Sequence, residues 1–136
     1  MVGYRVRFVA KPISLTPPNY IFPSYFDVFY IHFPVALEYQ DPDESHPVGW
    51  QNAKGEVAQG KTPIQETWQA MEALVDIGLA KSIGICNFQG SLIIDLLRYA
   101  RIRPAILQLE IHPYLVQEDI VRFAQSENIA VTAYSS

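Results

Sequence analysis

The sequence predicts an α/β fold in which parallel strands alternate with helices. Four apolar, β-branched runs are short enough to be strands, and amphipathic helical patterns lie between them. Strands joined through helices run parallel, which leaves a doubly wound sheet or a (β/α) barrel. No G-x-G-x-x-G or G-x-x-x-x-G-K-[ST] loop follows a strand. We therefore predict a barrel, or part of one.

Composition limits the classes of protein to be considered. The chain has 136 residues, 49% of them hydrophobic and 18% charged, which suits one domain with a core, or a piece of one. The net charge of −4 argues against nucleic acid or an anionic membrane as the main partner. Cys86 is the only cysteine, so an intramolecular disulfide is excluded and a reducing compartment is favoured. We expect a cytoplasmic protein.

The first 26 residues differ from the rest. Their only charges are basic, and four prolines interrupt any long helix or central strand. An acid-poor basic N-terminus is also seen in organelle transit peptides, but the amphipathic Arg-rich helix is not evident. We expect residues 1–26 to be an irregular leader and residues 27–136 to form the folded part.

The first predicted strand covers residues 27–34 and ends at Pro34. Residues 35–61 are rich in turn formers, which predicts a long loop. The apolar residues of this loop could line the mouth of a pocket or hold the loop on the domain, and both interpretations remain open; they are Leu37, Tyr39, Val48 and Trp50.

The remaining elements follow in regular alternation. Thr62 and Gln65 match a capping box at the start of a helix, and Gly78 suits the position after its end. A strand over residues 82–87, a helix over 91–100, a strand over 105–110, a helix over 118–128 and a strand over 129–134 complete the pattern. The predicted inward positions of the three helices are Ile64, Trp68, Met71, Leu74 and Val75; Leu92, Ile93, Leu96 and Leu97; and Ile120, Val121, Phe123 and Ala124.

Polar side chains stand at the ends of these strands, where a barrel keeps its active site. His32 could orient a substrate oxygen or be a core histidine satisfied by backbone groups. Asn87 and Gln108 could together hold a carboxamide, or cap their strands. Tyr134 could stack on a flat ring or pack in the core. Cys86 has no basic neighbour that would make it a nucleophile.

A metal site is not predicted. The spacing of His46, Glu110 and His112 matches no zinc-binding pattern.

Several motifs together resemble those of the aldo-keto reductase family. MEALVDIGLAKSIGICNF at residues 71–88 resembles the family signature, and DVFYIHFP at 27–34 resembles its histidine strand. PAILQLEIHPYL at 104–115 and NIAVTAYSS at 128–136 are similar to two later strands. The matches are collinear, and the loop containing HPVGW is most similar to that of fungal xylose (aldose) reductases.

The resemblance implies a TIM barrel that reduces aldehydes or aldoses with NADPH or NADH. It implies that His32 orients the substrate carbonyl and that Phe33 and Trp50 line the substrate pocket. It also implies a set of cofactor-binding residues: Cys86, Asn87, Gln108, Tyr134, Ser135 and Ser136. Cys86 stands where the family more often has serine, so its bond to the carboxamide is expected to be weaker.

The resemblance covers roughly strands four to seven of an eight-stranded barrel. The family's catalytic tyrosine, lysine and aspartate have no recognisable counterpart in residues 1–26. We therefore expect a truncated reductase that is inactive alone and that self-associates through open sheet edges. The alternative is a non-catalytic half-barrel that binds nucleotide or a partner protein.

Overall fold

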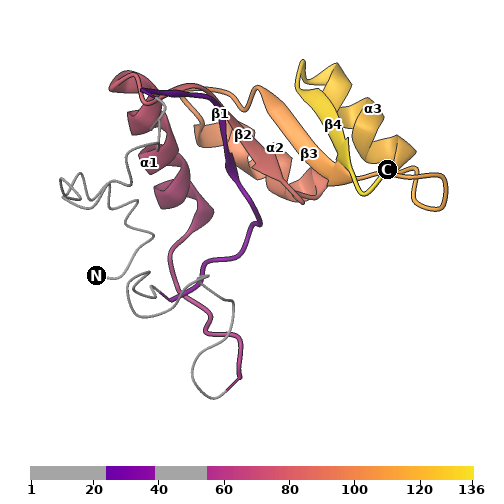
Figure 1. Cartoon of the computed structure of the whole chain (residues 1–136), viewed down its shortest axis with the longest axis horizontal. Helices are drawn as coiled ribbons and strands as arrows, with labels where there is room; N and C mark the ends of the chain where they lie inside the picture. Colours follow the sequence, from indigo (N-terminus) through magenta and orange to yellow (C-terminus); the bar gives the residue numbers. More distant parts are fainter. Residues whose placement is uncertain (1–23, 39–54) are drawn as a thin grey trace, which may run out of the picture.

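The computed structural model describes residues 24–38 and 55–136. Strands and helices alternate along the described chain, as predicted, and Figure 1 shows them in order. The elements are β1 (Phe26–Ile31), α1 (Ile64–Asp76), β2 (Ala80–Cys86), α2 (Gly90–Tyr99), β3 (Ile106–Glu110), α3 (Glu118–Ser126) and β4 (Ala130–Tyr134).

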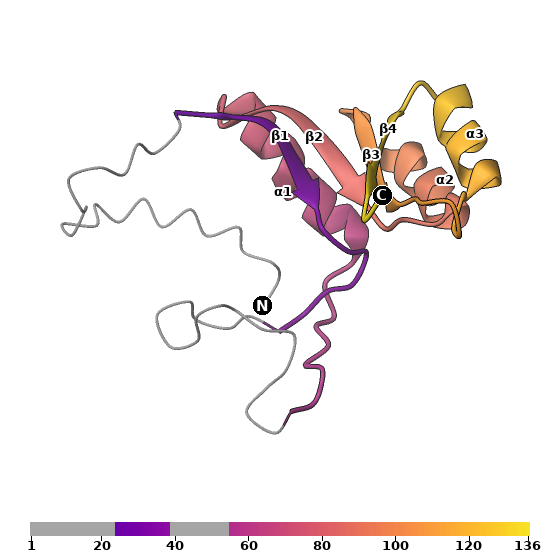
Figure 2. The same ribbon diagram turned by 45° about the vertical axis from the view of Figure 1, so that its right-hand side comes forward.

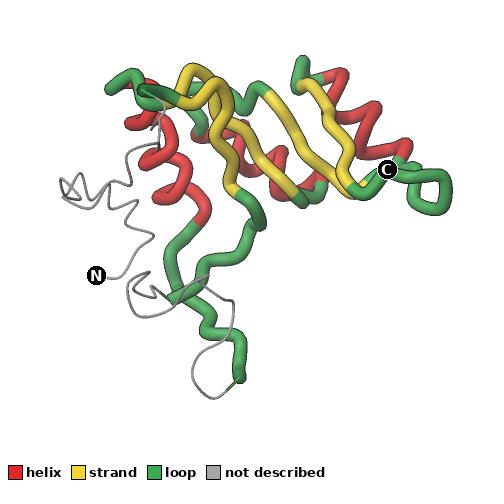
Figure 3. Tube along the Cα trace, in the orientation of Figure 1, coloured by secondary structure: helices red, strands yellow, loops and turns green. Residues whose placement is uncertain are grey.

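The strands form one parallel sheet in the order β1-β2-β3-β4. Residue pairs such as Tyr30 with Gly84, Cys86 with Gln108 and Glu110 with Tyr134 define its register. All three helices cover the same face of the sheet (Figures 2 and 3). Within residues 24–38 and 55–136 the sheet is therefore an open arc with one covered face and one face free of helices, which agrees with the prediction of a partial barrel.

The hydrophobic core lies between the helices and the covered face. Trp68 and Met71 of α1, Ile93 and Leu96 of α2 and Ala124 of α3 are all fully or almost fully buried there. Alternate strand residues supply the other side of the core: Phe29, Ile31, Ile83, Ile85, Leu107, Leu109 and Val131. Because side chains alternate along a strand, the residues between them point to the helix-free face: Tyr30, Gly84, Cys86, Gln108 and Tyr134.

Two helices end in the same way. Gly78 (φ +75°) follows α1, and the amides of Gly78 and Leu79 bond to the carbonyls of Val75 and Leu74. Asn128 (φ 59°) follows α3 with the same pair of bonds, one from its own amide and one from that of Ile129. Both ends are Schellman motifs, which require a left-handed residue at this position. The prediction for Gly78 is confirmed.

The predicted capping box at α1 is wrong. The helix begins at Ile64, Pro63 occupies the N-cap position in an extended conformation, and no side chain caps the helix. Thr62 therefore lies one residue before the N-cap position. The strand bounds also shift slightly, since β1 runs from Phe26 to Ile31 and leaves Pro34 in the following loop.

The loop after β1 leaves the sheet through a short antiparallel stem. Leu37 pairs with Gln59, and the amide of Gly60 donates to the carbonyl of Ala36 at 2.8 Å. A Cβ atom at Gly60 would lie 2.8 Å from the Leu37 carbonyl oxygen, so only glycine fits this approach. Most of the predicted leader, residues 1–23, and the loop residues 39–54 lie outside the described residues.

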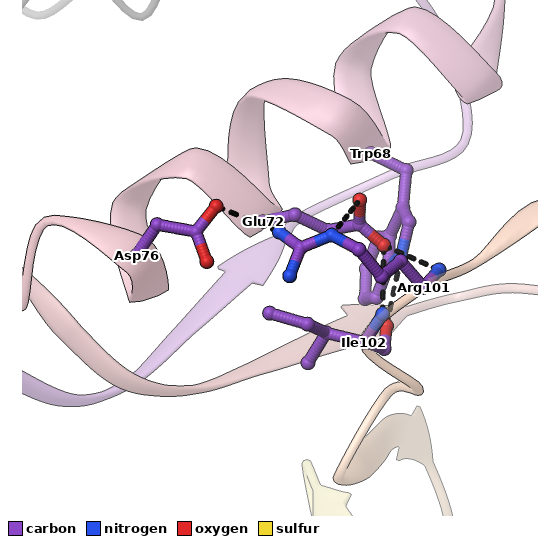
Figure 4. Close-up of polar contacts among 5 residues, drawn as sticks. All are labelled: Trp68, Glu72, Asp76, Arg101 and Ile102. Atoms are coloured by element: carbon purple, nitrogen blue, oxygen red, sulfur yellow. Dashed lines mark hydrogen bonds and ion pairs between the residues drawn. The ribbon is translucent and has the colours of Figure 1, made fainter.

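A buried carboxylate joins α1 to the turn between α2 and β3 (Figure 4). Glu72 is only 6% exposed. One of its oxygens accepts the backbone amides of Arg101 and Ile102, while the indole nitrogen of Trp68 donates to the Ile102 carbonyl at 3.0 Å. The Glu72 carboxylate therefore has a cation as well as two backbone amides as partners, because the Arg101 guanidinium also lies 3.7 Å from it.

Candidate active site

The carboxyl ends of the strands bring three of the predicted site residues into direct contact. The side-chain nitrogen of Asn87 donates to the backbone carbonyl of His32 at 3.1 Å. The hydroxyl of Tyr134 donates to the side-chain oxygen of Asn87 at 2.7 Å. Asn87 has a left-handed backbone (φ 60°), which asparagine tolerates better than most residues. The ends of β1, β2 and β4 are therefore connected through one amide.

Cys86 links Gln108 to Asn87 through hydrogen bonds. Its thiol donates to the side-chain oxygen of Gln108 at 3.4 Å and accepts a hydrogen bond from the Asn87 side-chain nitrogen at 3.2 Å. The residue is 1% exposed, and burial raises the pKa of the thiol. A thiol that stays protonated is a poor nucleophile, so its role at this site is hydrogen bonding.

Tyr134 is half-buried on the helix-free face. Desolvation raises its pKa, and the nearby Glu110 and Cys86 raise it further, while the hydrogen bond with Asn87 lowers it. The hydroxyl thus stays protonated and acts as a donor. Ser135 and Ser136 follow β4 and are exposed, and Ser135 has a left-handed backbone (φ 56°).

His32 and Phe33 lie at the end of β1 beside a cavity. Their rings pack edge to face, with centroids 4.6 Å apart. The cavity has a volume of about 310 Å³, and both rings line it. Its other walls come from β1, the following loop and the start of α1, and they include Tyr30, Leu37, Ile64 and Met71. Trp50, the other predicted pocket residue, lies outside the described residues.

Two groups near the site were not predicted from the sequence. Tyr30 lies over Gly84, where a Cβ atom would approach its ring to 2.9 Å. Its position two residues before His32 is the signal that could have placed it on the same face. Glu110 and His112 form a pair, with a carboxylate oxygen 3.3 Å from the imidazole Nε2.

The polar groups left over at the site fit a carboxamide. Within the described residues, the Gln108 side-chain nitrogen has no hydrogen-bond partner, so it offers donors. The side-chain oxygen of Asn87 has accepted one hydrogen bond and has room for a second. A primary carboxamide needs one donor and one acceptor, and the ring of Tyr134 offers an adjacent flat surface.

A lysine, an aspartate and a tyrosine lie together at the other end of the sheet. Lys81 contacts the carboxylate of Asp27 at 2.8 Å and lies 3.8 Å from the ring centroid of Tyr25. All three residues are at the amino ends of β1 and β2 and are exposed, opposite the end of the sheet that carries His32.

In the described part of the chain, no helix is long and apolar enough to cross a membrane.

Comparisons with known proteins agree with this geometry. Residues 22–136 match the model of the aldo/keto reductase family. A probable NAD(P)H-dependent D-xylose reductase of Emericella nidulans is 66% identical over 113 residues, which cover 83% of this chain and 35% of the relative. An NAD(P)H-dependent D-xylose reductase of Pyricularia oryzae is 59% identical over 115 residues, 83% of this chain and 36% of the relative.

Solved structures are similar over the same portion. An aldose reductase of Giardia lamblia is 41% identical with a TM-score of 0.73, covering 82% of this chain and 36% of that structure. A Bombyx mori aldo-keto reductase in complex with NADP is 38% identical with a TM-score of 0.68, covering 82% of this chain and 31% of that structure. The open sheet is thus part of a TIM barrel, as predicted.

The chain spans about a third of the length of the curated relatives it matches. The family match nevertheless covers the whole described fold and every described residue of the site. The chain belongs to the aldo/keto reductase family.

Proposed function

We propose that this chain is part of an NAD(P)H-dependent reductase that converts the aldehyde of an aldose to an alcohol. The proposal rests on one observation. Asn87 is hydrogen-bonded to His32 and Tyr134 at the carboxyl end of the sheet, and Cys86 links Gln108 to this group. The relatives named as D-xylose reductases and the similar structure with NADP support this choice of substrate and cofactor.

In this proposal each residue has a distinct task. Asn87 and Gln108 hold the carboxamide of the cofactor, Tyr134 stacks on its ring, and Ser135 and Ser136 contact its phosphates. The bound NAD(P)H supplies the hydride. His32 donates a hydrogen bond to the substrate carbonyl, and so orients it. Phe33 and Trp50 line the pocket that receives the sugar.

The 136-residue chain by itself is proposed to bind the cofactor without turning it over. Protonation of the carbonyl oxygen requires an acid near the hydride acceptor. Among the described residues, a tyrosine, a lysine and an aspartate do lie together. They are Tyr25, Lys81 and Asp27, at the amino end of the sheet, opposite His32. His32 and the amides can therefore position reactants without completing the reaction.

Binding and turnover are tested separately on the purified chain. We expect the emission of NADPH to change saturably on titration, and this change to disappear in the double variant Asn87→Leu, Gln108→Leu. Gln125→Leu is the matched control, because Gln125 is an exposed amide on α3, far from the strand ends. No binding by the unmodified chain contradicts the proposed cofactor. Oxidation of NADPH by D-xylose above the blank contradicts the proposed lack of turnover.

The alternative is a non-catalytic half-barrel that binds nucleotide or a partner protein, and the unpaired outer edges of the described sheet favour it. β1 and β4 each have one side without a strand partner in the described sheet, and exposed strand edges promote association. We propose self-association through these edges. Sedimentation velocity should show the average mass rising with protein concentration, whereas a monomer at all concentrations contradicts this proposal.

We also propose a cytoplasmic location, which the presence of a single, buried cysteine supports. Fractionation of cells that produce the chain should recover it with cytoplasmic markers. Recovery with secreted or organellar markers contradicts this proposal.

A further inference from the structure

We propose that Cys86 is a positioning residue that sets the orientation of the two site amides and so presents a donor from Gln108 and an acceptor from Asn87 to a primary carboxamide. The inference rests on the proposed function, since it concerns the same carboxamide site. Its basis is that one buried sulfur contacts both amides at once: Sγ lies 3.4 Å from Gln108 Oε1 and 3.2 Å from Asn87 Nδ2.

The amide of Asn87 is held by three contacts. Its nitrogen has two hydrogens, and one goes to the His32 carbonyl at 3.1 Å while the other goes to the Cys86 sulfur. The Asn87 oxygen then faces the Tyr134 hydroxyl, 2.7 Å away. A turn of this amide by half a revolution would bring its oxygen against the His32 carbonyl, and both groups are acceptors. The contacts therefore leave an acceptor position free on Asn87.

The amide of Gln108 is held by the thiol alone. Its oxygen accepts the thiol hydrogen, so the nitrogen points away from Cys86, and within the described residues no group accepts its hydrogens. The backbone carbonyl of Gln108 is already engaged with the amide of Asn87 at 3.0 Å, which keeps the two residues in register. Gln108 is thus fixed as a donor.

Cys86 can fix both amides because a thiol donates and accepts at the same time. At 1% exposure no solvent reaches the sulfur to replace either contact. Without the thiol, Gln108 can turn its amide freely, because its ends differ only in hydrogen bonding. The donor that Gln108 presents to the carboxamide oxygen would then be lost.

The test uses the unmodified chain with Cys86→Ala, which removes the bridge, and Cys86→Ser, which keeps a group that donates and accepts. Two quantities are measured. The first is the ¹⁵N resonances of the Asn87 and Gln108 side-chain amides without ligand. The second is the pair of dissociation constants of NADP and of its 3-acetylpyridine analogue, which keeps the carbonyl oxygen but has a methyl group in place of the carboxamide nitrogen.

We expect Cys86→Ala to bind NADP and the analogue each ~10-fold more weakly than the unmodified chain and Cys86→Ser do, the size of one hydrogen bond, because both ligands carry the oxygen that Gln108 would contact. The Gln108 amide signals should move in Cys86→Ala and return in Cys86→Ser. If Cys86→Ala unfolds, Cys86→Val takes its place, since valine fills the volume without a hydrogen bond.

Unchanged amide signals and unchanged dissociation constants in the variant that lacks the bridge overturn the positioning role. Failure of serine to restore them overturns it as well. If no dinucleotide binds but the amide signals move and recover as expected, the proposed cofactor is wrong and the positioning of the amides by Cys86 stands.

Discussion

The carboxylate of Glu72 lies 2.7 Å from the backbone nitrogen of Arg101, and so ties α1 to the turn that leads into β3. We expect Glu72→Ala to lower the free energy of unfolding by about 2–4 kcal/mol, because two backbone amides lose a buried acceptor and Arg101 loses its charge partner. Urea denaturation measures the change.

Asp76→Ala is the matched control. Asp76 also pairs with Arg101, at 2.7 Å, but its side chain is 54% exposed. Its removal should cost about 0.5 kcal/mol or less. Equal losses for the two variants would show that the backbone contacts of Glu72 contribute nothing.

Gly84→Ala should disturb the helix-free face of the sheet. The new Cβ would lie 2.9 Å from the carbonyl oxygen of Ile106 and 2.9 Å from the Tyr30 ring. A backbone atom cannot move aside cheaply, so we expect a loss of about 1–3 kcal/mol in the free energy of unfolding. In Gly90→Ala the new Cβ meets nothing within 4 Å, and thermal unfolding should show no loss of stability there. A neutral Gly84→Ala would contradict the tight packing.

The folded chain should lose stability in alkali partly through Cys86. Burial raises the pKa of this thiol above its ordinary value of 9.0, so the folded state keeps the proton to higher pH than the unfolded state does. The contribution of the thiol is therefore complete below pH 9.0 and declines as the pH rises toward its pKa in the folded chain. Burial also raises the pKa of Tyr30, whose ordinary value is 10.0, so a second decline begins there.

Cys86→Ser isolates the first part of this decline, because serine does not ionise in this range. Denaturation midpoints measured in steps above pH 9.0 should fall less steeply for Cys86→Ser than for the unmodified chain. Parallel curves for the two proteins would mean that the thiol does not contribute.

Tyr134 is predicted to act on the cofactor through its ring. Tyr134→Phe keeps the ring and loses the hydroxyl that lies 2.7 Å from Asn87. We expect its affinity for NADPH to stay within about threefold of the original, while Tyr134→Ala loses ~10-fold because stacking is removed. Titration by NADPH emission compares them. A larger loss for phenylalanine than for alanine would assign the role to the hydroxyl instead.

The fold could be predicted from local patterns because each pattern has a local cause. Apolar, β-branched runs mark strands because their residues pack in the core, and Gly78 marks a helix end because it adopts a left-handed backbone. The capping box failed because Thr62 and Gln65 fit the motif in spacing, but Pro63 took the N-cap position itself. Such competition between neighbouring residues is not visible in a motif.

The site could be predicted only as a set of separate side chains. The strand ends place His32, Asn87 and Tyr134 at the carboxyl end of the sheet, but which of them contact one another depends on the register of the strands. The link from Cys86 to Gln108 depends on the pairing of β2 with β3, and no spacing in the sequence encodes it. The burial of Glu72 was missed for a similar reason, since its partners lie 29 and 30 positions later.

The Schellman ends of α1 and α3 also determine which way the next strand faces. Leu79 and Ile129 each bond back to the last turn of their helix, and the strand begins at the very next residue. Only the three residues of the Schellman turn separate each helix from the strand that follows it. One amino acid inserted at either junction would turn every side chain of the following strand to the opposite face. In β2, for example, Ile83 and Ile85 would leave the core and Cys86 would enter it. The turn at the amino end of each strand thus determines which of its side chains face the site at the carboxyl end.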